Sequence, residues 1–328
     1  MKLLVTGGAG FIGSCFVRHI LKKYNDYQVI NLDALTYAGN IENLDDVKDN
    51  PNYRFVHGNI CDKKLAKELI IDEGVDAVIN FAAESHVDRS ITGPEIFIET
   101  NVQGTLNLLQ AAKEAKTQRF LQVSTDEVYG TLGKVGYFYE TTPLAPNSPY
   151  SASKASADML VRAYYETYKM PVLNTRCSNN YGPYQYPEKL IPFFISQLLK
   201  GEKVPVYGDG MNVRDWLYVY DHCSAIDTVL HKGKVGEVYN IGGHNEKTNM
   251  EITKIILEAM GKDESSIRYV EDRLGHDRRY AIDNHKIQSE LGWEPSLTFE
   301  EGIKLTIDWY LNNQDWMKSI EAKKASLV

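Results

Sequence analysis

The stretch VTGGAGFIG, residues 5–13, joins a short apolar run to a segment of helical period, and the fold can be derived outward from it. Gly7, Gly10 and Gly13 permit a tight turn and let backbone N–H groups approach a pyrophosphate at the positive end of the helix that follows. Such a pattern also occurs in ordinary turns. Alone, it predicts a strand–turn–helix unit with a candidate phosphate site.

A carboxylate ends the next predicted strand, YQVINLD at 27–33. Asp33 lies twenty residues after Gly13, where an acidic residue can accept both ribose hydroxyls of a dinucleotide. Ala34 stands where an arginine would suggest a 2′-phosphate, so the sequence predicts NAD rather than NADP. The alternative is a turn followed by a surface aspartate.

Short β-branched runs alternate with segments of helical period through the first half of the chain. This pattern indicates βαβ units, which form a parallel sheet with helices on both faces. We therefore predict an α/β fold with a Rossmann-like, doubly wound parallel sheet. Its strands are expected at 2–6, 27–33, 53–58, 76–82, 119–125 and 171–176.

The composition changes near Asn179, where the chain becomes rich in Gly, Pro, Asn and Tyr and fewer strands follow. We predict an NAD-binding domain at 1–178, with a later return to it near 215–242, and a smaller, mainly substrate-binding region at 179–328. TFEEGIKLTIDWYLNN, residues 298–313, predicts a C-terminal helix with an apolar stripe.

The overall composition excludes several classes of protein. The 328 residues are 43% hydrophobic and carry a formal net charge of −8, which argues against nucleic acid as a partner. No apolar run approaches the length of a membrane span, and the N-terminal run is too short for a signal peptide, so we expect a cytoplasmic protein. Four scattered cysteines suggest neither disulfides nor zinc, and no metal is predicted.

Two residue groups suggest catalysis. In SPYSASK, residues 148–154, Tyr150 and Lys154 are four apart just inside a helix, and this spacing places them on one face. A nearby ammonium favours phenolate, which would make Tyr150 a base near neutral pH. This spacing alone is more often structural than functional.

The second group is VSTDEVYG, residues 123–130, where Asp126 and Glu127 stand at the end of a predicted strand. Neighbours on a regular strand point to opposite faces, so these acids can converge only if the chain is irregular there. To act as an acid near neutral pH, Asp126 would need burial or repulsion from Glu127 to raise its pKa. The alternative is a solvated loop.

Together these motifs resemble the extended short-chain dehydrogenase/reductase family over essentially the whole chain. Within it, five segments resemble the 4,6-dehydratases that act on dTDP-glucose: STDEVYG, SNNYGPYQYPEKLIP, GDGMNVRDWLYV, GGHNEKTN and GHDRRYAID. The resemblance implies NAD on the N-terminal sheet, a nucleotide sugar in the cleft beside the C-terminal region, and a homodimer paired through helices.

The reaction implied by this resemblance has a use for both acids. Tyr150, beside Thr125 and Lys154, takes the C4 hydroxyl proton while hydride passes to NAD. Elimination across C5 and C6 then needs a second base and an acid, and the resemblance assigns Glu127 to C5 and Asp126 to the C6 hydroxyl. Hydride returns to C6 and gives the 4-keto-6-deoxy sugar with NAD recycled.

The resemblance also implies binding residues. Expected cofactor contacts are Gly7, Gly10, Phe11, Ile12, Gly13, Asp33, Asn59, Ile60, Ala82, Tyr150 and Lys154. Asn59 stands where the family usually has Asp, although its amide oxygen can still accept a hydrogen bond. Expected substrate contacts are Ser85 and Asn179 near the sugar, Lys189, Leu190, Pro205 and Tyr207 near the nucleoside, and Arg214, Asn249, Arg273 and His276 near the diphosphate or nucleotide. The cations among these could instead form surface salt bridges.

Other functions remain open. A nucleotide-sugar 4-epimerase shares the oxidation but has no use for Asp126 and Glu127. A 4,6-dehydratase of UDP- or CDP-glucose differs in the base, which proteins often read through backbone groups. A non-catalytic NAD-sensing protein would not need Tyr150, Lys154 and both acids together.

Overall fold

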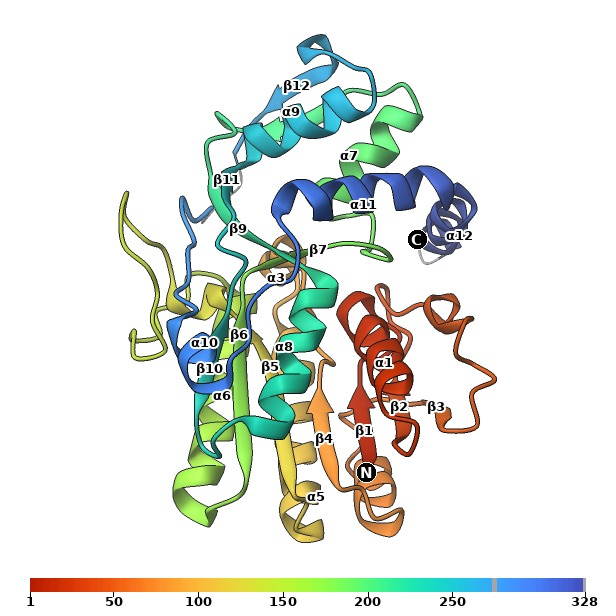
Figure 1. The fold of residues 1–328 in the computed structure, drawn as a ribbon, viewed down its shortest axis with the longest axis vertical. Helices are drawn as coiled ribbons and strands as arrows, with labels where there is room; N and C mark the ends of the chain where they lie inside the picture. Colours follow the sequence, from red (N-terminus) through yellow and green to blue (C-terminus); the bar gives the residue numbers. More distant parts are fainter. Residues whose placement is uncertain (273–275, 327–328) are drawn as a thin grey trace.

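Seven parallel strands form the main sheet of the computed structural model, which describes residues 1–272 and 276–326, the last three by their backbone alone. Their order is β3–β2–β1–β4–β5–β6–β10, and every neighbouring pair is parallel (Figure 1). The six predicted strands are confirmed, with boundaries shifted by at most two residues. The strands are β1 Lys2–Thr6, β2 Gln28–Asp33, β3 Tyr53–His57, β4 Ala77–Asn80, β5 Arg119–Thr125, β6 Val172–Cys177 and β10 Val238–Ile241.

Helices cover both faces of this sheet. α1 and α8 pack together on one face, and α5 and α6 lie on the other. Alternate residues of β1 serve the two cores, because Leu3 and Val5 turn toward α1 and α8 whereas Leu4 turns toward α5. This confirms the predicted Rossmann-like fold. The helices are α1 Phe11–Lys23, α2 Lys63–Lys67, α3 Val87–Thr92, α4 Glu95–Phe97, α5 Thr105–Ala115, α6 Pro149–Tyr168, α8 Val219–Lys232 and α10 His285–Leu291.

A smaller region lies above the carboxyl ends of the main-sheet strands (Figure 1). It holds a three-stranded sheet, a two-stranded sheet and a core of its own, while α8 and β10 return to the large sheet. No helix in residues 1–272 and 276–326 is long and apolar enough to cross a membrane. The elements of the smaller region are β7 Asn179–Tyr181, β9 Val213–Tyr218 and β11 Glu246–Thr248, β8 Val204–Tyr207 and β12 Ile267–Val270, with α7 Leu190–Leu199, α9 Asn249–Ala259 and α11 Phe299–Asn312.

The predicted C-terminal helix is confirmed as α11, but a further helix, α12 (Gln314–Ser326), follows it and was not predicted. α12 binds the turn η1 (Ile41–Leu44) of the N-terminal part: Trp316 Nε1 donates to Asn43 Oδ1 at 2.9 Å. Ser319 and Lys323 bind Glu42 in the same turn, while Lys200, directly after α7, pairs with Glu321. α12 therefore connects the two parts of the molecule.

Replacing Trp316 should weaken this connection. Its ring packs against Tyr184, Trp309 and Tyr310, so Trp316→Ala is expected to lower the free energy of unfolding by about 2 kcal/mol. Leu305→Ala, on the exposed side of α11, is the control and should change it by less than about 0.5 kcal/mol. Urea unfolding measures both, and equal effects would contradict an anchoring role for α12.

Candidate active site

A cavity of about 340 Å³ opens at the carboxyl ends of the main-sheet strands. Its walls come from the segments that follow β1, β2, β3, β4, β5 and β6, together with residues 179–189. The strand order reverses between β1 and β4, and open α/β sheets bind ligands at such a switch point. Its volume is that of a small-molecule site.

The glycine turn forms the floor of one end of this cavity. Gly7 has φ +67°, and a Cβ there would lie 2.7 Å from Ala82 N, while a Cβ on Gly13 would lie 2.2 Å from Gly7 O. Side chains at these positions are therefore excluded. The N-cap of α1 is Gly10, and no side chain caps this end of the helix, so its first amide groups can bind a phosphate.

Asp33, the predicted ribose contact, is the last residue of β2 and lines the cavity. It is buried and accepts hydrogen bonds from Ala9 N and Leu35 N, both at 2.8 Å. Burial raises its pKa, and these two bonds oppose the shift. Each carboxylate oxygen has a second acceptor position, so the residues present fit a dinucleotide without a 2′-phosphate.

Asn59, the predicted adenine contact, lines this cavity, with Ile60 beside it. Its amide oxygen already accepts from Cys61 N at 2.8 Å. The side chain therefore has Nδ2, a donor, and one remaining lone pair on Oδ1 to offer a base. An aspartate at this position would instead offer the base a second oxygen as a hydrogen-bond acceptor.

The chain becomes irregular where the two acids stand, which confirms that expectation. β5 ends at Thr125, and the 3-10 turn η4 (Asp126–Tyr129) begins at the next residue, with Thr125 Oγ1 accepting from Glu127 N at 3.3 Å. Both acids line the cavity. Leaving the strand thus removes the alternation that would have separated Asp126 from Glu127.

Asp126 meets the physical requirement for an acid. Burial raises its pKa well above the usual value, the charges of Glu127 and Asp215 add to this, and Arg214 opposes it. Its Oδ2 has no hydrogen-bond partner among the described residues. A protonated carboxyl group is therefore favoured here.

Tyr150 and Lys154 project from α6 into the cavity. The prediction that Lys154 lowers the pKa of Tyr150 is wrong for the protein without ligands. Burial, and then the charge of Glu127, raise the pKa of Tyr150 well above its usual value. Burial lowers the pKa of Lys154, whose Nζ donates to Val123 O at 2.8 Å. Desolvation thus outweighs the predicted stabilisation of a phenolate.

The predicted substrate contacts fall into two groups. Ser85, Asn179 and Lys189 line the cavity, and Lys189 Nζ donates to Ser85 O at 3.3 Å. Leu190, Pro205, Tyr207, Arg214, Asn249 and His276 lie in the smaller region outside the cavity wall, and Arg273 lies outside the described residues.

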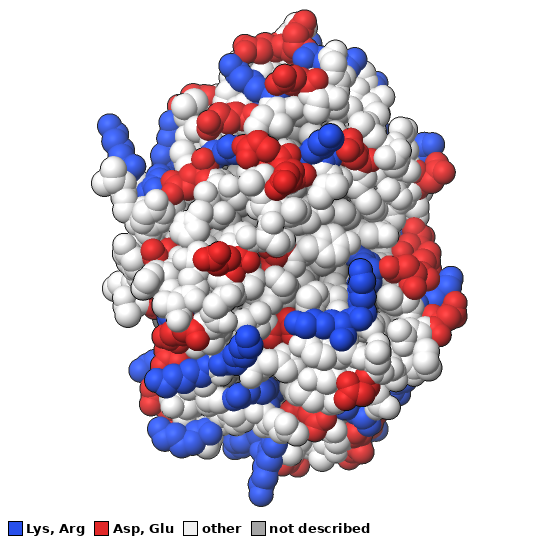
Figure 2. Space-filling model, viewed as in Figure 1, with Lys and Arg blue, Asp and Glu red and all other residues white. Residues whose placement is uncertain are grey.

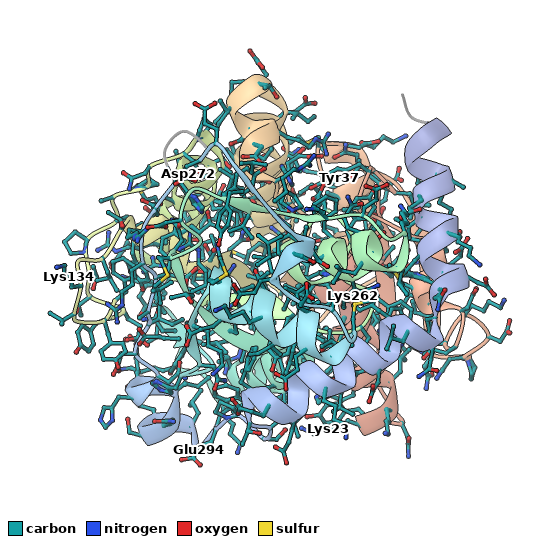
Figure 3. The ribbon with its side chains drawn as sticks, turned by 90° about the horizontal axis from the view of Figure 1, so that it is seen from above. Lys23, Tyr37, Lys134, Lys262, Asp272 and Glu294 are labelled. Carbon is teal, nitrogen blue, oxygen red and sulfur yellow. The ribbon has the colours of Figure 1, made fainter. Side chains whose placement is uncertain are left out.

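Two residues of this second group pack against neighbours of their own. Arg214 stacks on Tyr280 at 4.3 Å, and His276 pairs with Asp272 at 2.5 Å. In the view from above, Figure 3 labels Asp272 well apart from Tyr37, which lies on the cofactor side.

Several cavity residues were not predicted, among them Tyr37, Glu84 and Cys177. The Arg89 guanidinium lies 3.8 Å from the centre of the Tyr37 ring and 3.6 Å from Glu84 Oε2. The sequence signal for Tyr37 was its position in the turn directly after Asp33. Glu84 and Cys177 carry no comparable signal.

Charges on the molecular surface are mixed. On the face shown in Figure 2, acidic and basic side chains are interspersed among uncharged ones. Within the part of the chain that the structure describes, no group of three or more His, Cys, Asp or Glu side chains could hold a metal ion.

Comparisons with known proteins agree with this geometry. The family model described as GDP-mannose 4,6 dehydratase matches residues 4–306. The dTDP-glucose 4,6-dehydratase of Xanthomonas campestris pv. campestris (strain B100) is 57% identical over 335 residues, which cover 97% of this chain and 95% of the relative.

Solved structures show the same likeness. DesIV, a dTDP-glucose 4,6-dehydratase from Streptomyces venezuelae crystallised with NAD and dTDP, is 54% identical with a TM-score of 0.95, covering 98% of this chain and 100% of that one. The UDP-glucose 4-epimerase of Thermotoga maritima is 34% identical with a TM-score of 0.89, covering 96% and 100%. Epimerases share the fold, but the dehydratases are much closer in sequence.

Asp126→Asn should stabilise the protein at neutral pH. Because the folded-state pKa of Asp126 is raised above about 3.8, its stabilising contribution is complete below that pH and is lost as the pH rises through the folded-state pKa. Asparagine does not titrate, so the free energy of unfolding of the variant should exceed that of the wild type by roughly 1 kcal/mol at pH 7 and should equal it near pH 3.

Asp209→Asn is the matched control. Arg278 lowers the pKa of the exposed Asp209 carboxyl to about 2, so its contribution is present above the unfolded value and is lost as the pH falls toward 2. The two variants should therefore show opposite pH dependence in urea unfolding. A pH-independent difference for Asp126→Asn would refute its buried, protonated state.

Proposed function

The chain belongs to the family described as GDP-mannose 4,6 dehydratase, and we propose that within it the protein converts dTDP-glucose to dTDP-4-keto-6-deoxyglucose. The reaction eliminates water, so the enzyme is a lyase, and it uses NAD as a recycled cofactor. The product is an intermediate in the synthesis of deoxysugars. One observation carries the proposal: η4 brings Asp126 and Glu127 into the same cavity as Tyr150.

Each residue of this cavity has a defined task in the proposed mechanism. NAD, when bound, supplies the acceptor for the C4 hydride and the donor for C6. Tyr150 would take the C4 hydroxyl proton as its phenolate, a form that the positive charge of bound NAD would favour beside Lys154, and Thr125 would hydrogen-bond the C4 oxygen. Lys154, held by Val123 O, places a positive charge under this end of the cavity.

The acid pair carries out the elimination. A ketone at C4 acidifies the C5 proton, which Glu127 removes as the base. Asp126, whose pKa is raised by burial, donates its proton to the C6 hydroxyl as it leaves as water. The two neighbouring carboxyl groups thus have opposite protonation states, and burial of Asp126 favours this difference.

The cofactor end of the site has a matching set of groups. The bare N-terminus of α1 would hold the pyrophosphate, and Asp33 would hold the ribose. Asn59 and Ile60 lie at the adenine end, and Ala82 closes the glycine turn. On the substrate side, Ser85 and Asn179, which line the cavity, would contact the sugar, and Lys189 would contact the nucleotide.

A 4-epimerase is the second candidate and is less supported. It would use Tyr150 and NAD in the same way, and the fold alone admits it. It would, however, have no use for a buried carboxyl group at Asp126, which costs folding free energy. We infer the thymidine base of the substrate from the names of the relatives and not from a contact in this structure.

We further propose that the enzyme is a cytoplasmic homodimer. α6 contacts α3 and the π-helical turn η3 (Ile98–Gly104), and this surface exposes Ile91, Ile98 and Met159 by 43%, 52% and 56%. Apolar side chains exposed on elements that pack together favour an interface. Free cysteines are in keeping with a reducing compartment.

Asp126→Asn and Glu127→Gln should separate the two halves of the reaction. Both keep the shape of the side chain, so C4 oxidation by Tyr150 should proceed while water loss slows at least ~100-fold, and reduced cofactor should accumulate. Rapid-mixing absorbance with mass analysis of the quenched sugar measures both steps. Formation of the 4-keto-6-deoxy sugar at normal rates would contradict the roles of the pair.

Two controls complete this experiment. Tyr150→Phe should prevent oxidation itself, so no reduced cofactor should appear. In deuterated water the wild type should introduce deuterium at C5, because that carbon is reprotonated from an exchangeable group. If the enzyme converts UDP- or CDP-glucose as fast as it converts dTDP-glucose, the proposed preference for thymidine is contradicted.

The homodimer is tested on the surface of α6. Met159→Glu places a charge in the proposed interface and should shift the mass measured by light scattering from dimer toward monomer. Leu305→Glu, on the exposed side of α11, is the control and should remain dimeric. A wild type that is monomeric at all concentrations would exclude the dimer.

A further inference from the structure

Arg176 is a buried cation in β6, and it lies outside the cavity wall. Its side chain is 7% exposed and divides its fork between two partners: Nε donates to Asp158 Oδ2 and Nη1 donates to the Tyr129 hydroxyl, both at 2.9 Å. A buried charge is tolerated only with such compensation. These partners belong to the two elements that carry the proposed catalytic groups.

Asp158 connects Arg176 to the helix that carries the base. It follows Lys154 by four residues on α6, and Lys154 follows Tyr150 by four, so the three share one helical face. Burial lowers the pKa of Lys154, and the Asp158 carboxylate opposes this. The ion pair with Arg176 thus attaches α6 to β6. It also holds in place the Asp158 carboxylate, which favours the charged form of Lys154.

Tyr129 connects Arg176 to the turn that carries the acids. It is the last residue of η4, and its hydroxyl donates to Asn240 Oδ1 at 2.8 Å while it accepts from Arg176. Burial raises its pKa to about 12, so the hydroxyl keeps its proton for this bond. Its ring stacks on Phe138 at 5.0 Å. The end of η4 is therefore attached to both β6 and β10.

The register of the sheet places Arg176, which links Asp158 to Tyr129, directly behind the active site. Arg176 pairs with Ser124 of β5 on one side and with Asn240 of β10 on the other. The next row contains Thr125, after which η4 begins. η4 is thus held at its start by β5 and at its end by this link.

We propose that Tyr129, Arg176 and Asp158 are positioning residues that hold the two acids of η4 in register with Tyr150 of α6. This inference rests on the proposed function. Loss of the Tyr129 hydroxyl releases the end of η4, whereas Tyr150 and Lys154 remain fixed by α6 and Val123 O. The elimination, which depends on η4, should therefore suffer more than the oxidation at C4.

Tyr129→Phe tests this separation because it keeps the ring and its stacking on Phe138. With dTDP-glucose, kcat should fall ~10-fold or more, as expected when reacting groups lose alignment, and KM should change less than about twofold. In a single turnover, reduced cofactor should accumulate above the wild-type level. A loss of stability alone would produce neither the accumulation nor the split between kcat and KM.

Tyr239→Phe is the matched control. Tyr239 precedes Asn240 on β10 and belongs to the core on the α1–α8 face; its buried hydroxyl donates to Glu290 and accepts from Lys234 N, both at 3.0 Å. Its loss should lower stability without accumulation of reduced cofactor. Arg176→Lys, which keeps the charge but lacks the fork, is the second variant and should accumulate reduced cofactor as Tyr129→Phe does.

The outcomes distinguish this inference from the proposed function. If the wild type converts dTDP-glucose and both Tyr129→Phe and Arg176→Lys match it in kcat and cofactor absorbance, the positioning role is overturned and the function stands. Equal accumulation in Tyr239→Phe would also overturn it. If the wild type does not convert dTDP-glucose, the proposed function fails, and this inference fails with it.

Discussion

The active site depends on one break in regular structure, the point at which β5 becomes a 3-10 turn after Thr125. The Thr125 hydroxyl accepts from Glu127 N there and fixes the turn, so that two consecutive acids reach one cavity. The same strand supplies the Val123 carbonyl that holds Lys154. A single strand end thus aligns the groups to which the proposed mechanism assigns the chemistry at C4, C5 and C6 of one sugar.

Burial of the ionisable side chains at this strand end lowers the free energy of unfolding. Burial is the first cause of the shifted pKa of Asp126, of Tyr150 and of Lys154, and in each it disfavours the charged form. Behind the cavity, in contrast, the buried charges of Arg176 and Asp158 are paired at 2.9 Å. Shifted pKa values of this kind, on several groups that line one cavity, are typical of active sites.

Local sequence signals identified much of this arrangement. Runs of β-branched residues located six strands, and the glycine turn with Asp33 identified the cofactor end. The pKa of Tyr150 could not be predicted from the spacing to Lys154, because burial of the whole site outweighs one neighbouring charge. Arg176 was missed because its partners are 18 and 47 residues away and meet it only through the sheet. α12 has too weak an apolar stripe to be recognised before its partner surface is known.

The order of synthesis gives α12 a further significance. The glycine turn, Asp33 and β1 to β6 leave the ribosome long before residues 314–326, and domains generally fold as they emerge. Ile320 and Lys323 of α12 later settle beside Tyr37 and Gly39, in the turn that follows Asp33. In the nascent chain this turn thus lacks the neighbours that α12 later provides. The turn after Asp33 therefore acquires these neighbours only after residues 314–326 have emerged.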